Sequence, residues 1–254
     1  SGGPANHEHA DRNSVIFKDY GERLLHDPFR AAYINTQPRW MLRHTGAHTA
    51  VLINGQGHQY HDGSEGTNAS WAFARVTDYR TGPGWMTVTS DATDAYQLVN
   101  DKVTRVLRTL VYLKPDVVVF LDRVTLKATP ATVQLRFQAN NEDLAATLAL
   151  PDGNFLLTRS LLGRVARAPG LTVRLGQLPL EAKDGSQPYA EIESASATEH
   201  EILTVCSARP TGTSHGDLRL TREGHAWRIT GTHAAQRINV TIDPVSAVPV
   251  ITIT

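Results

Sequence analysis

Apolar residues alternate with polar ones along much of this chain, and a period of two is the spacing of a β-strand rather than of a helix. Between residues 102 and 113, one face of an extended strand would carry Val103, Leu107, Val111 and Leu113, and the other Val106, Leu110 and Tyr112. A strand that is apolar on both faces belongs in a sheet that is covered on both sides. Lys114-Pro115-Asp116 then has turn chemistry, and the β-branched run Val117–Leu121 follows it. The sequence therefore predicts a hairpin built from these two segments.

Shorter apolar runs continue to the end of the chain, separated by clusters of Gly, Pro, Asp and Ser. They comprise residues 133–137, 171–175, 202–206, 218–220, 227–229, 238–242 and 248–253. No segment after residue 60 combines about ten residues of helical spacing with capping residues. Regular short strands with such turns are typical of a sandwich or a barrel, so we expect an all-β fold. We expect one large domain over residues 1–254, with a minor subdivision near Asp152 or Pro210 as the alternative.

The charge balance argues against two classes of partner. Lys and Arg total 25 and Asp and Glu total 25, and no basic block is present, so we expect neither a nucleic-acid nor a membrane partner. The longest apolar stretch, Val117–Leu121, is far shorter than the ~20 residues of a membrane-spanning helix. The single cysteine, Cys206, lies in an apolar run and is expected to pack in the core.

Histidines are concentrated near the N-terminus. Seven of them lie within the first 61 residues: His7, His9, His26, His44, His48, His58 and His61. In His7-Glu8-His9 two imidazoles have the i, i+2 spacing that places them on one face of a strand, and Asp11 or Asp27 could complete a zinc site. Histidines on a solvated loop would give the same short pattern. We expect His58 in an exposed turn and solvated positions for His200, His215, His225 and His233.

Three blocks of polar residues follow one another within the first 57 residues. They are Asn6-His7-Glu8-His9-Ala10-Asp11-Arg12-Asn13-Ser14, Tyr20-Gly21-Glu22 leading to His26-Asp27, and His48-Thr49-Ala50-Val51-Leu52-Ile53-Asn54-Gly55. Their order resembles the opening of the heparinase II/III-like domain of polysaccharide lyases, which include heparinases and oligoalginate lyases. The sequence departs from that pattern at Thr49, Ala50 and Asn54. Lys114-Pro115-Asp116 and Asp122-Arg123-Val124 resemble a hairpin of the same family, so the resemblance covers at least residues 6–124.

The resemblance implies a fold and a metal. In this family a large two-layered antiparallel β-sandwich follows an α/α toroid, and the sandwich holds one zinc ion through two histidines and an aspartate. The matching positions are His9, Asp27 and His48, so Zn²⁺ is the expected cofactor. It is expected to shape the site rather than to perform the reaction. On spacing alone, His44 remains an alternative to His48, and Asp11 to Asp27.

The resemblance also implies a reaction. A uronate lyase removes the C5 proton beside the sugar carboxylate and expels the 4-linked sugar, which needs acid and base groups and donors to the carboxylate. The matching catalytic candidates are His7 and Tyr33, the only tyrosine between Asp27 and His48. Nearby, Arg30, Arg39 and Arg43 are candidates for binding the carboxylates or sulfates of an anionic polysaccharide or oligosaccharide.

The toroid has no counterpart in this sequence, because only five residues precede Asn6. We therefore expect an excised or processed portion of a lyase that needs an N-terminal toroid domain or a separate helical chain for full activity. The alternative is a non-catalytic, zinc-stabilised sandwich that binds carbohydrate or docks onto a partner. A periplasmic or secreted location is implied by the resemblance alone.

Overall fold

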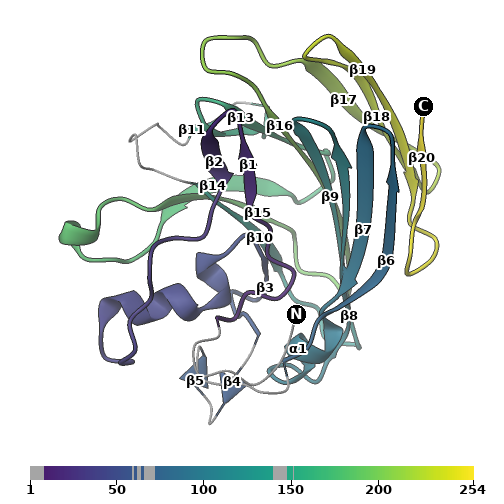
Figure 1. The fold of residues 1–254 in the computed structure, drawn as a ribbon. Helices are drawn as coiled ribbons and strands as arrows, with labels where there is room; N and C mark the ends of the chain where they lie inside the picture. The colour runs from purple at the N-terminus through teal and green to yellow at the C-terminus, as the bar shows by residue number, and fades with distance from the viewer. Residues whose placement is uncertain (1–8, 59, 62–63, 66–71, 140–147, 151) are drawn as a thin grey trace.

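An eight-stranded antiparallel sheet forms the centre of the molecule (Figure 1). The computed structural model describes residues 9–58, 60–61, 64–65, 72–139, 148–150 and 152–254. The strand order of the central sheet is β11-β12-β13-β16-β9-β8-β7-β6. Its strands are β6 (Arg75–Gly82), β7 (Trp85–Asp91), β8 (Val103–Leu113), β9 (Val117–Leu126), β11 (Leu148–Ala149), β12 (Phe155–Thr158), β13 (Leu161–Val165) and β16 (Glu199–Ala208).

The hairpin predicted from the alternating pattern is confirmed as β8 and β9, which pair Leu113 with Val117 and Val111 with Val119. Both faces of these strands are covered, as the pattern indicated. The register shifts between Val103 and Arg105, which is a β-bulge. Because a shift of one residue changes the face to which a side chain points, Val103 packs with Val106 rather than with Val111.

A four-stranded sheet packs on one face of the central sheet. Its strand order is β14-β15-β10-β3, with β3 (Val51–Ile53), β10 (Val133–Gln138), β14 (Thr172–Gln177) and β15 (Pro188–Glu193). The shared core includes Phe120, Phe137 and Phe155. The ring centroids of Phe120 and Phe137 are 5.3 Å apart, and those of Phe137 and Phe155 are 5.4 Å apart. Cys206 is buried in this core, as predicted.

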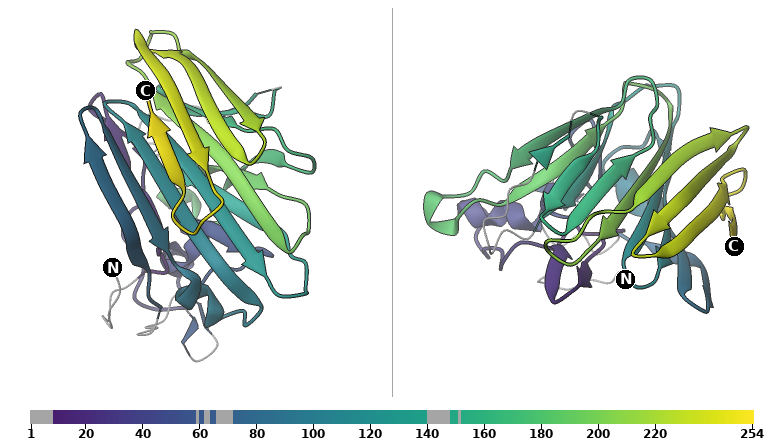
Figure 2. Two further views of the ribbon diagram at one scale, coloured as in Figure 1. Left: turned by 90° about the vertical axis from the view of Figure 1, so that its right-hand side faces the viewer. Right: turned by 90° about the horizontal axis from the view of Figure 1, so that it is seen from above.

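The C-terminal sheet packs on the opposite face (Figure 2). Its strand order is β17-β18-β19-β20, with β17 (Asp217–Glu223), β18 (Ala226–His233), β19 (Gln236–Asp243) and β20 (Val250–Ile253). Val119, Leu121 and Val205 of the central sheet meet Trp227 and Val240 of this sheet. The prediction of an all-β antiparallel sandwich is confirmed, and this sheet adds a third layer to the two that were expected.

The remaining elements are short. They are β1 (Phe17–Asp19), β2 (Glu22–Leu25), β4 (Tyr60–His61), β5 (Ser64–Glu65), α1 (Thr93–Gln97) and the 3-10 helices η1 (Pro38–Arg43), η2 (Thr45–Ala47) and η3 (Ala182–Asp184). Helix α1 was not predicted. Among the described residues, no helix has the length and apolar character needed to cross a membrane. The division of the chain into one domain or two stays a prediction.

A buried ion pair ties the N-terminal segments to the central sheet. Arg108 of β8 donates from Nε to Asp122 Oδ1 of β9 at 2.7 Å, and both side chains are almost completely buried. Arg108 also donates from Nη1 to the backbone carbonyls of Asn13, at 2.8 Å, and Thr49, at 2.6 Å. Burial raises the pKa of Asp122 even though the charge of Arg108 opposes the shift. This arginine therefore fixes two segments that flank the candidate site.

Candidate active site and metal site

The three residues predicted to bind zinc come from separate segments and lie together. Asp27 follows β2, His48 follows η2, and His9 is the first residue that the structure describes. The Nδ1 atom of His48 lies 2.9 Å from Asp27 Oδ1, at hydrogen-bonding distance. The imidazole of His9 is 5.3 Å from that of His48, measured between ring centroids. The structure thus groups His9, Asp27 and His48, while His7 lies outside the described residues.

The protonation of this group suits metal binding. Burial lowers the pKa of His9, and the charges of His48 and Arg43 lower it further against those of Asp11 and Asp27. Burial alone would raise the pKa of Asp27, but the hydrogen bond from His48 and the nearby histidine charges outweigh it and lower the pKa. Neutral imidazole and ionised carboxylate are the forms that bind metal ions.

The geometry fits zinc in part. His48 Nε2 is buried and has no hydrogen-bond partner among the described residues, which leaves a nitrogen atom that a metal ion could satisfy. A metal ion on Nε2 would leave Asp27 on the other ring nitrogen, where carboxylates commonly orient zinc-binding histidines, whereas Asp27 as a ligand would need the metal ion on the Nδ1 side of the ring. Within the described residues, however, no group of three His, Cys, Asp or Glu residues is placed to hold a metal ion. The residues match zinc by type and charge, and the zinc site stays a prediction.

The two alternative ligands occupy different surroundings. Asp11 forms an ion pair of 3.0 Å with Arg12 Nη1, and its charge also acts on the pKa of His9. His44 caps the junction between η1 and η2, and its backbone N–H donates to Met41 O. Asp27 is the carboxylate that contacts His48, so the described geometry favours it over Asp11.

Tyr33 lies among arginine side chains. Arg30 Nη2 donates to the Tyr33 hydroxyl at 2.8 Å, and the Arg43 guanidinium is 5.9 Å from the Tyr33 ring and 4.8 Å from the Trp40 ring. Tyr33 is 53% exposed, whereas Arg43 is buried. The backbone carbonyl of Arg43 accepts from the N–H of Ala10 at 2.7 Å, which connects this cluster to the residue after His9.

Arg39 is placed differently from the other two predicted arginines. Its Nε donates to Asp184 Oδ1 at 2.8 Å, and its guanidinium lies 4.6 Å from the centre of the Phe29 ring. Asp184 is part of η3, far from Tyr33 in the chain. Arg30 and Arg43 therefore accompany Tyr33, and Arg39 contacts a neighbouring segment.

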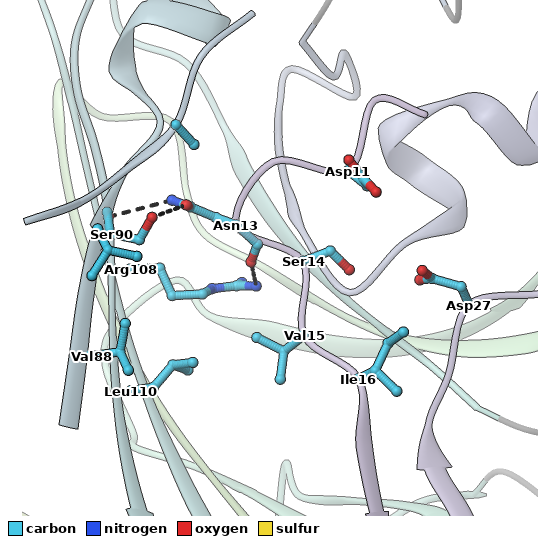
Figure 3. A pocket seen from close by; sticks show the side chains of 12 residues that line it. Asp11, Asn13, Ser14, Val15, Ile16, Asp27, Val88, Ser90, Arg108 and Leu110 are labelled. Carbon is cyan, nitrogen blue, oxygen red and sulfur yellow. Dashed lines mark hydrogen bonds between the residues drawn. The ribbon is translucent and has the colours of Figure 1, made fainter. Parts of the chain in front are cut away.

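A cavity of about 320 Å³ opens beside Asp27 (Figure 3). Asp11, Ser14 and Asp27 line it from the N-terminal segments, and Ser90 and Arg108 line it from the central sheet. The Ser90 hydroxyl donates to the side-chain oxygen of Asn13 at 2.6 Å, so a hydrogen bond joins the N-terminal segment to the central sheet at this cavity. The sequence did not single out Arg108 or Ser90, because each lies inside a strand pattern with no local sign of a site.

The prediction of an exposed turn at His58 is wrong. His58 is fully buried, its Nε2 accepts from the backbone N–H of Arg12 at 2.9 Å, and its ring packs 5.1 Å from that of Tyr96. Burial holds its pKa well below the usual value, and the charges of Arg12 and His48 act in the same direction. His58 thus anchors the segment after His9 as a neutral side chain.

Three of the four C-terminal histidines also differ from the expectation of solvated positions. His200 is buried, with Nδ1 2.8 Å from Ser194 Oγ and Nε2 3.0 Å from Ala197 O. His233 is buried with Nε2 2.6 Å from Ala208 O. The ring nitrogens of His215 are buried too, and burial lowers its pKa to about 3. His225 is exposed, as expected.

The Tyr20-Gly21 segment and the Lys114-Pro115-Asp116 turn, both singled out by the family resemblance, contact each other and have structural roles. Tyr20 and Gly21 have φ angles of 50° and 76° and form the two-residue turn between β1 and β2. The Tyr20 hydroxyl donates to Asp116 Oδ2 at 2.6 Å, so this turn is joined to the end of the central hairpin. Arg123 donates to the carbonyls of Pro244, at 2.9 Å, and Ser246, at 2.7 Å. Neither contact belongs to the candidate site.

Solved structures of lyases share this fold. The heparan sulfate lyase HepC from Pedobacter heparinus superposes with a TM-score of 0.67 at 12% identity, over 95% of this chain and 38% of that chain. A structure of heparinase III gives a TM-score of 0.60 at 12% identity, over 92% and 36%. A heparinase III with methylated lysines gives 0.66 at 12% identity, over 94% and 37%. The chain therefore spans less than two fifths of the length of these neighbours.

No curated protein matches the sequence significantly. The family model described as "Heparinase II/III-like, C-terminal" matches residues 1–184. That range contains the histidine cluster, Tyr33 and the arginines around it. The chain therefore belongs to the heparinase II/III-like family.

Proposed function

We propose that this chain is the β-sandwich portion of a polysaccharide lyase that cleaves a uronic-acid-containing polysaccharide by β-elimination. The observation that carries the proposal is the meeting of Asp27 and His48, from two of the sequence blocks that resemble the lyases, next to His9. The fold shared with heparan sulfate lyase and heparinase III supports the same reaction class. A sulfated glycosaminoglycan is therefore the first substrate class to test, and alginate the second.

We propose His9, Asp27 and His48 as ligands of one zinc ion. When bound, zinc would supply a fixed positive centre that holds the N-terminal segment and the segment before β3 together. The 2.9 Å approach of His48 Nδ1 to Asp27 Oδ1 supports this assignment, because it brings atoms of two of the three ligands together. The N–H of Ala10 donates to the backbone carbonyl of Arg43, so a zinc ion that fixes His9 would also help to fix the position of Arg43.

Tyr33 and His7 are the proposed acid and base groups. The reaction needs a proton taken from C5 and a proton given to the departing sugar oxygen, and a phenol and an imidazole can do both at a suitable pKa. Arg30 holds the Tyr33 hydroxyl at 2.8 Å and so orients it. Arg30 and Arg43 place two guanidinium groups by Tyr33, where they would bind the substrate carboxylate and stabilise the charge that develops on it.

Full activity is proposed to need an N-terminal α/α toroid domain or a separate helical chain. The neighbours in fold are more than twice as long as the part that this chain matches. Tyr33 is half exposed, which leaves it open to a substrate or to a second domain. A periplasmic or secreted location is part of the proposal, because a polysaccharide is met outside the cytoplasm.

The test is the formation of unsaturated product by the full-length parent protein on heparan sulfate, heparin and alginate, followed by ultraviolet absorbance. Tyr33→Phe and His7→Ala should each lower kcat by about 100-fold or more, since acid–base groups contribute ~10²–10⁴-fold. Tyr79→Phe, on an exposed position of β6, and His225→Ala serve as matched controls. Absence of unsaturated product from every uronate polymer would refute the proposal.

The competing function is a non-catalytic sandwich that binds carbohydrate or supports a partner. In this alternative zinc would serve stability alone, and the strand-rich architecture of the described residues motivates it. A glycan that binds the chain equally well after Tyr33→Phe and His7→Ala, with no turnover by the parent, would favour this function over the lyase.

A further inference from the structure

A second cavity, of about 600 Å³, lies where the C-terminal sheet ends over the central sheet. Its lining comes from β13, from β17, which is the edge strand of the C-terminal sheet, and from the turn before β12. Arg164 pairs with Val205 in the central sheet and so shares the face covered by the C-terminal strands. The candidate active site lies on the other face, with Leu24 and Leu25 of β2 in the opposite core. We call this second cavity the β13–β17 groove.

Positive charge exceeds negative charge in the β13–β17 groove. Among the described residues that line it, four are arginines and two carry carboxylates. The arginines are Arg164, Arg167, Arg219 and Arg222, and the carboxylates are Asp152 and Asp217. The whole chain has a formal net charge of zero, so this excess is a local feature. Charge of one sign in a cavity attracts ligands of the opposite sign.

Arg164 lies at the base of this excess. It is half-buried, donates from Nη1 to Ser207 Oγ at 3.0 Å, and donates from Nη2 to the carbonyl of Gly216. In the described part of the chain, no carboxylate forms an ion pair with it. Burial lowers its pKa, although the charges of Asp217 and Asp152 oppose the shift. A half-buried cation whose hydrogen-bond partners are neutral is stabilised when an anion binds beside it.

The other arginines are available to different degrees. Arg167 is exposed and has no ion pair among the described residues, and Arg219 lies 3.6 Å from Asp217 with both side chains 76% exposed. Such an exposed ion pair is weak, so an anion can compete for Arg219. Arg222 is more constrained, because it pairs with Glu201 at 3.1 Å and covers the ring of Trp227 at 4.7 Å.

The shape and lining define the class of ligand. The volume falls in the ~300–1,000 Å³ range of small-molecule sites. Trp227 is buried, and its Nε1 donates to Glu201 at 2.8 Å, so its ring is not an open platform for stacking. Recognition must therefore depend on charge and hydrogen bonds. Guanidinium groups pair well with planar carboxylates and with sulfates, often through two hydrogen bonds.

We propose that the β13–β17 groove binds an acidic saccharide segment through Arg164, Arg167 and Arg219, on the face of the central sheet opposite Tyr33. The class of ligand rests on the proposed function, but the site does not. A second binding site of this kind would hold a long acidic polymer on the sandwich while another part of the same polymer is cleaved.

The test is an NMR titration of the ¹⁵N-labelled chain with a heparin-derived tetrasaccharide, following the indole N–H signals of the four tryptophans. Trp227 lines the groove and Trp40 contacts Arg43, so their signals distinguish the two sites. We expect the Trp227 signal to shift at a saccharide concentration that leaves an equal amount of neutral chitotetraose without effect. A shift of the Trp40 signal alone, or no binding, would overturn the proposal.

Two double variants complete the test. Arg167→Ala/Arg219→Ala should weaken tetrasaccharide binding about tenfold, because two exposed charge-assisted contacts are lost. Arg75→Ala/Arg237→Ala removes the same charge from exposed positions outside the groove and should change affinity less than twofold. Equal affinity of the groove variant and the wild type would overturn the proposal.

Saccharide binding in the β13–β17 groove and lyase activity can be measured separately. Arg167→Ala/Arg219→Ala in the full-length parent should leave unsaturated-product formation from a short substrate unchanged. Binding in the groove without any product would support the groove and refute the lyase, whereas product formation with unaltered binding in the groove variant would do the reverse.

Discussion

Removing one partner of the buried Arg108–Asp122 pair should lower the free energy of unfolding by more than the loss of the contact itself. Asp122→Ala leaves the Arg108 guanidinium buried without its carboxylate, and removal of one partner of a buried pair typically costs about 3–5 kcal/mol of unfolding free energy. Arg108→Met leaves Asp122 unpaired and also removes a donor from the carbonyls of Asn13 and Thr49. We therefore expect the arginine variant to lie near the upper end, at about 5 kcal/mol.

The double variant Arg108→Met/Asp122→Ala distinguishes this explanation from a simple loss of contacts. With both charges gone, no unpaired charge stays buried, so the cost should be about 5 kcal/mol rather than the sum of about 8–10 kcal/mol. Urea unfolding followed by circular dichroism measures the three free energies. Arg75→Ala, which breaks an exposed pair with Asp94, should cost less than about 1 kcal/mol and serves as the control. Additive costs, or a loss below about 1 kcal/mol for Asp122→Ala, would refute the reasoning.

Three further predictions concern single residues. Tyr20→Phe removes the hydrogen bond to Asp116 and should cost about 1–2 kcal/mol in urea unfolding, while an unchanged free energy would show that the bond contributes nothing. His58 is neutral when folded but protonates below pH ~6.5 when unfolded, so wild-type stability should fall with pH below ~6.5 by up to about 1.4 kcal/mol per pH unit more steeply than that of His58→Gln. Parallel slopes in unfolding titrations between pH 6.5 and 5 would contradict this. Gly163→Ala would place a methyl group 2.2 Å from the Phe155 ring, so a loss of about 1–3 kcal/mol is expected, and wild-type thermal stability would disprove the crowding.

The strands were predictable wherever alternation was regular. The runs at residues 133–137, 171–175 and 202–206 became β10, β14 and β16, because each combines β-branched residues with turn residues at its ends. The third layer was not predictable, since period two gives the faces of a strand but not the sheet that covers each face. The bulge at Val103 was missed for a similar reason, because only the pairing register reveals it.

The candidate site was predictable only in part. The resemblance picked out His9, Asp27 and His48, and these residues do lie together. His58 was misplaced because glycine and aspartate neighbours indicate a turn, whereas its burial depends on Tyr96 and on a backbone N–H from residue 12. Arg39 and Arg43 lie in the same short segment of the sequence, and only the fold shows that Arg39 donates a hydrogen bond to Asp184. Long-range partners of this kind leave no local pattern.

A zinc ion held by His9, Asp27 and His48 is central to the proposed lyase sandwich, and the metal content of the chain tests it most directly. The purified, tag-free chain should contain about one zinc per molecule by plasma mass spectrometry. The zinc should be lost in His9→Ala and in His48→Ala, because each removes a proposed ligand, and retained in His225→Ala, where an exposed histidine is removed. Zinc absent from the wild type, or retained in both ligand variants, would contradict the account.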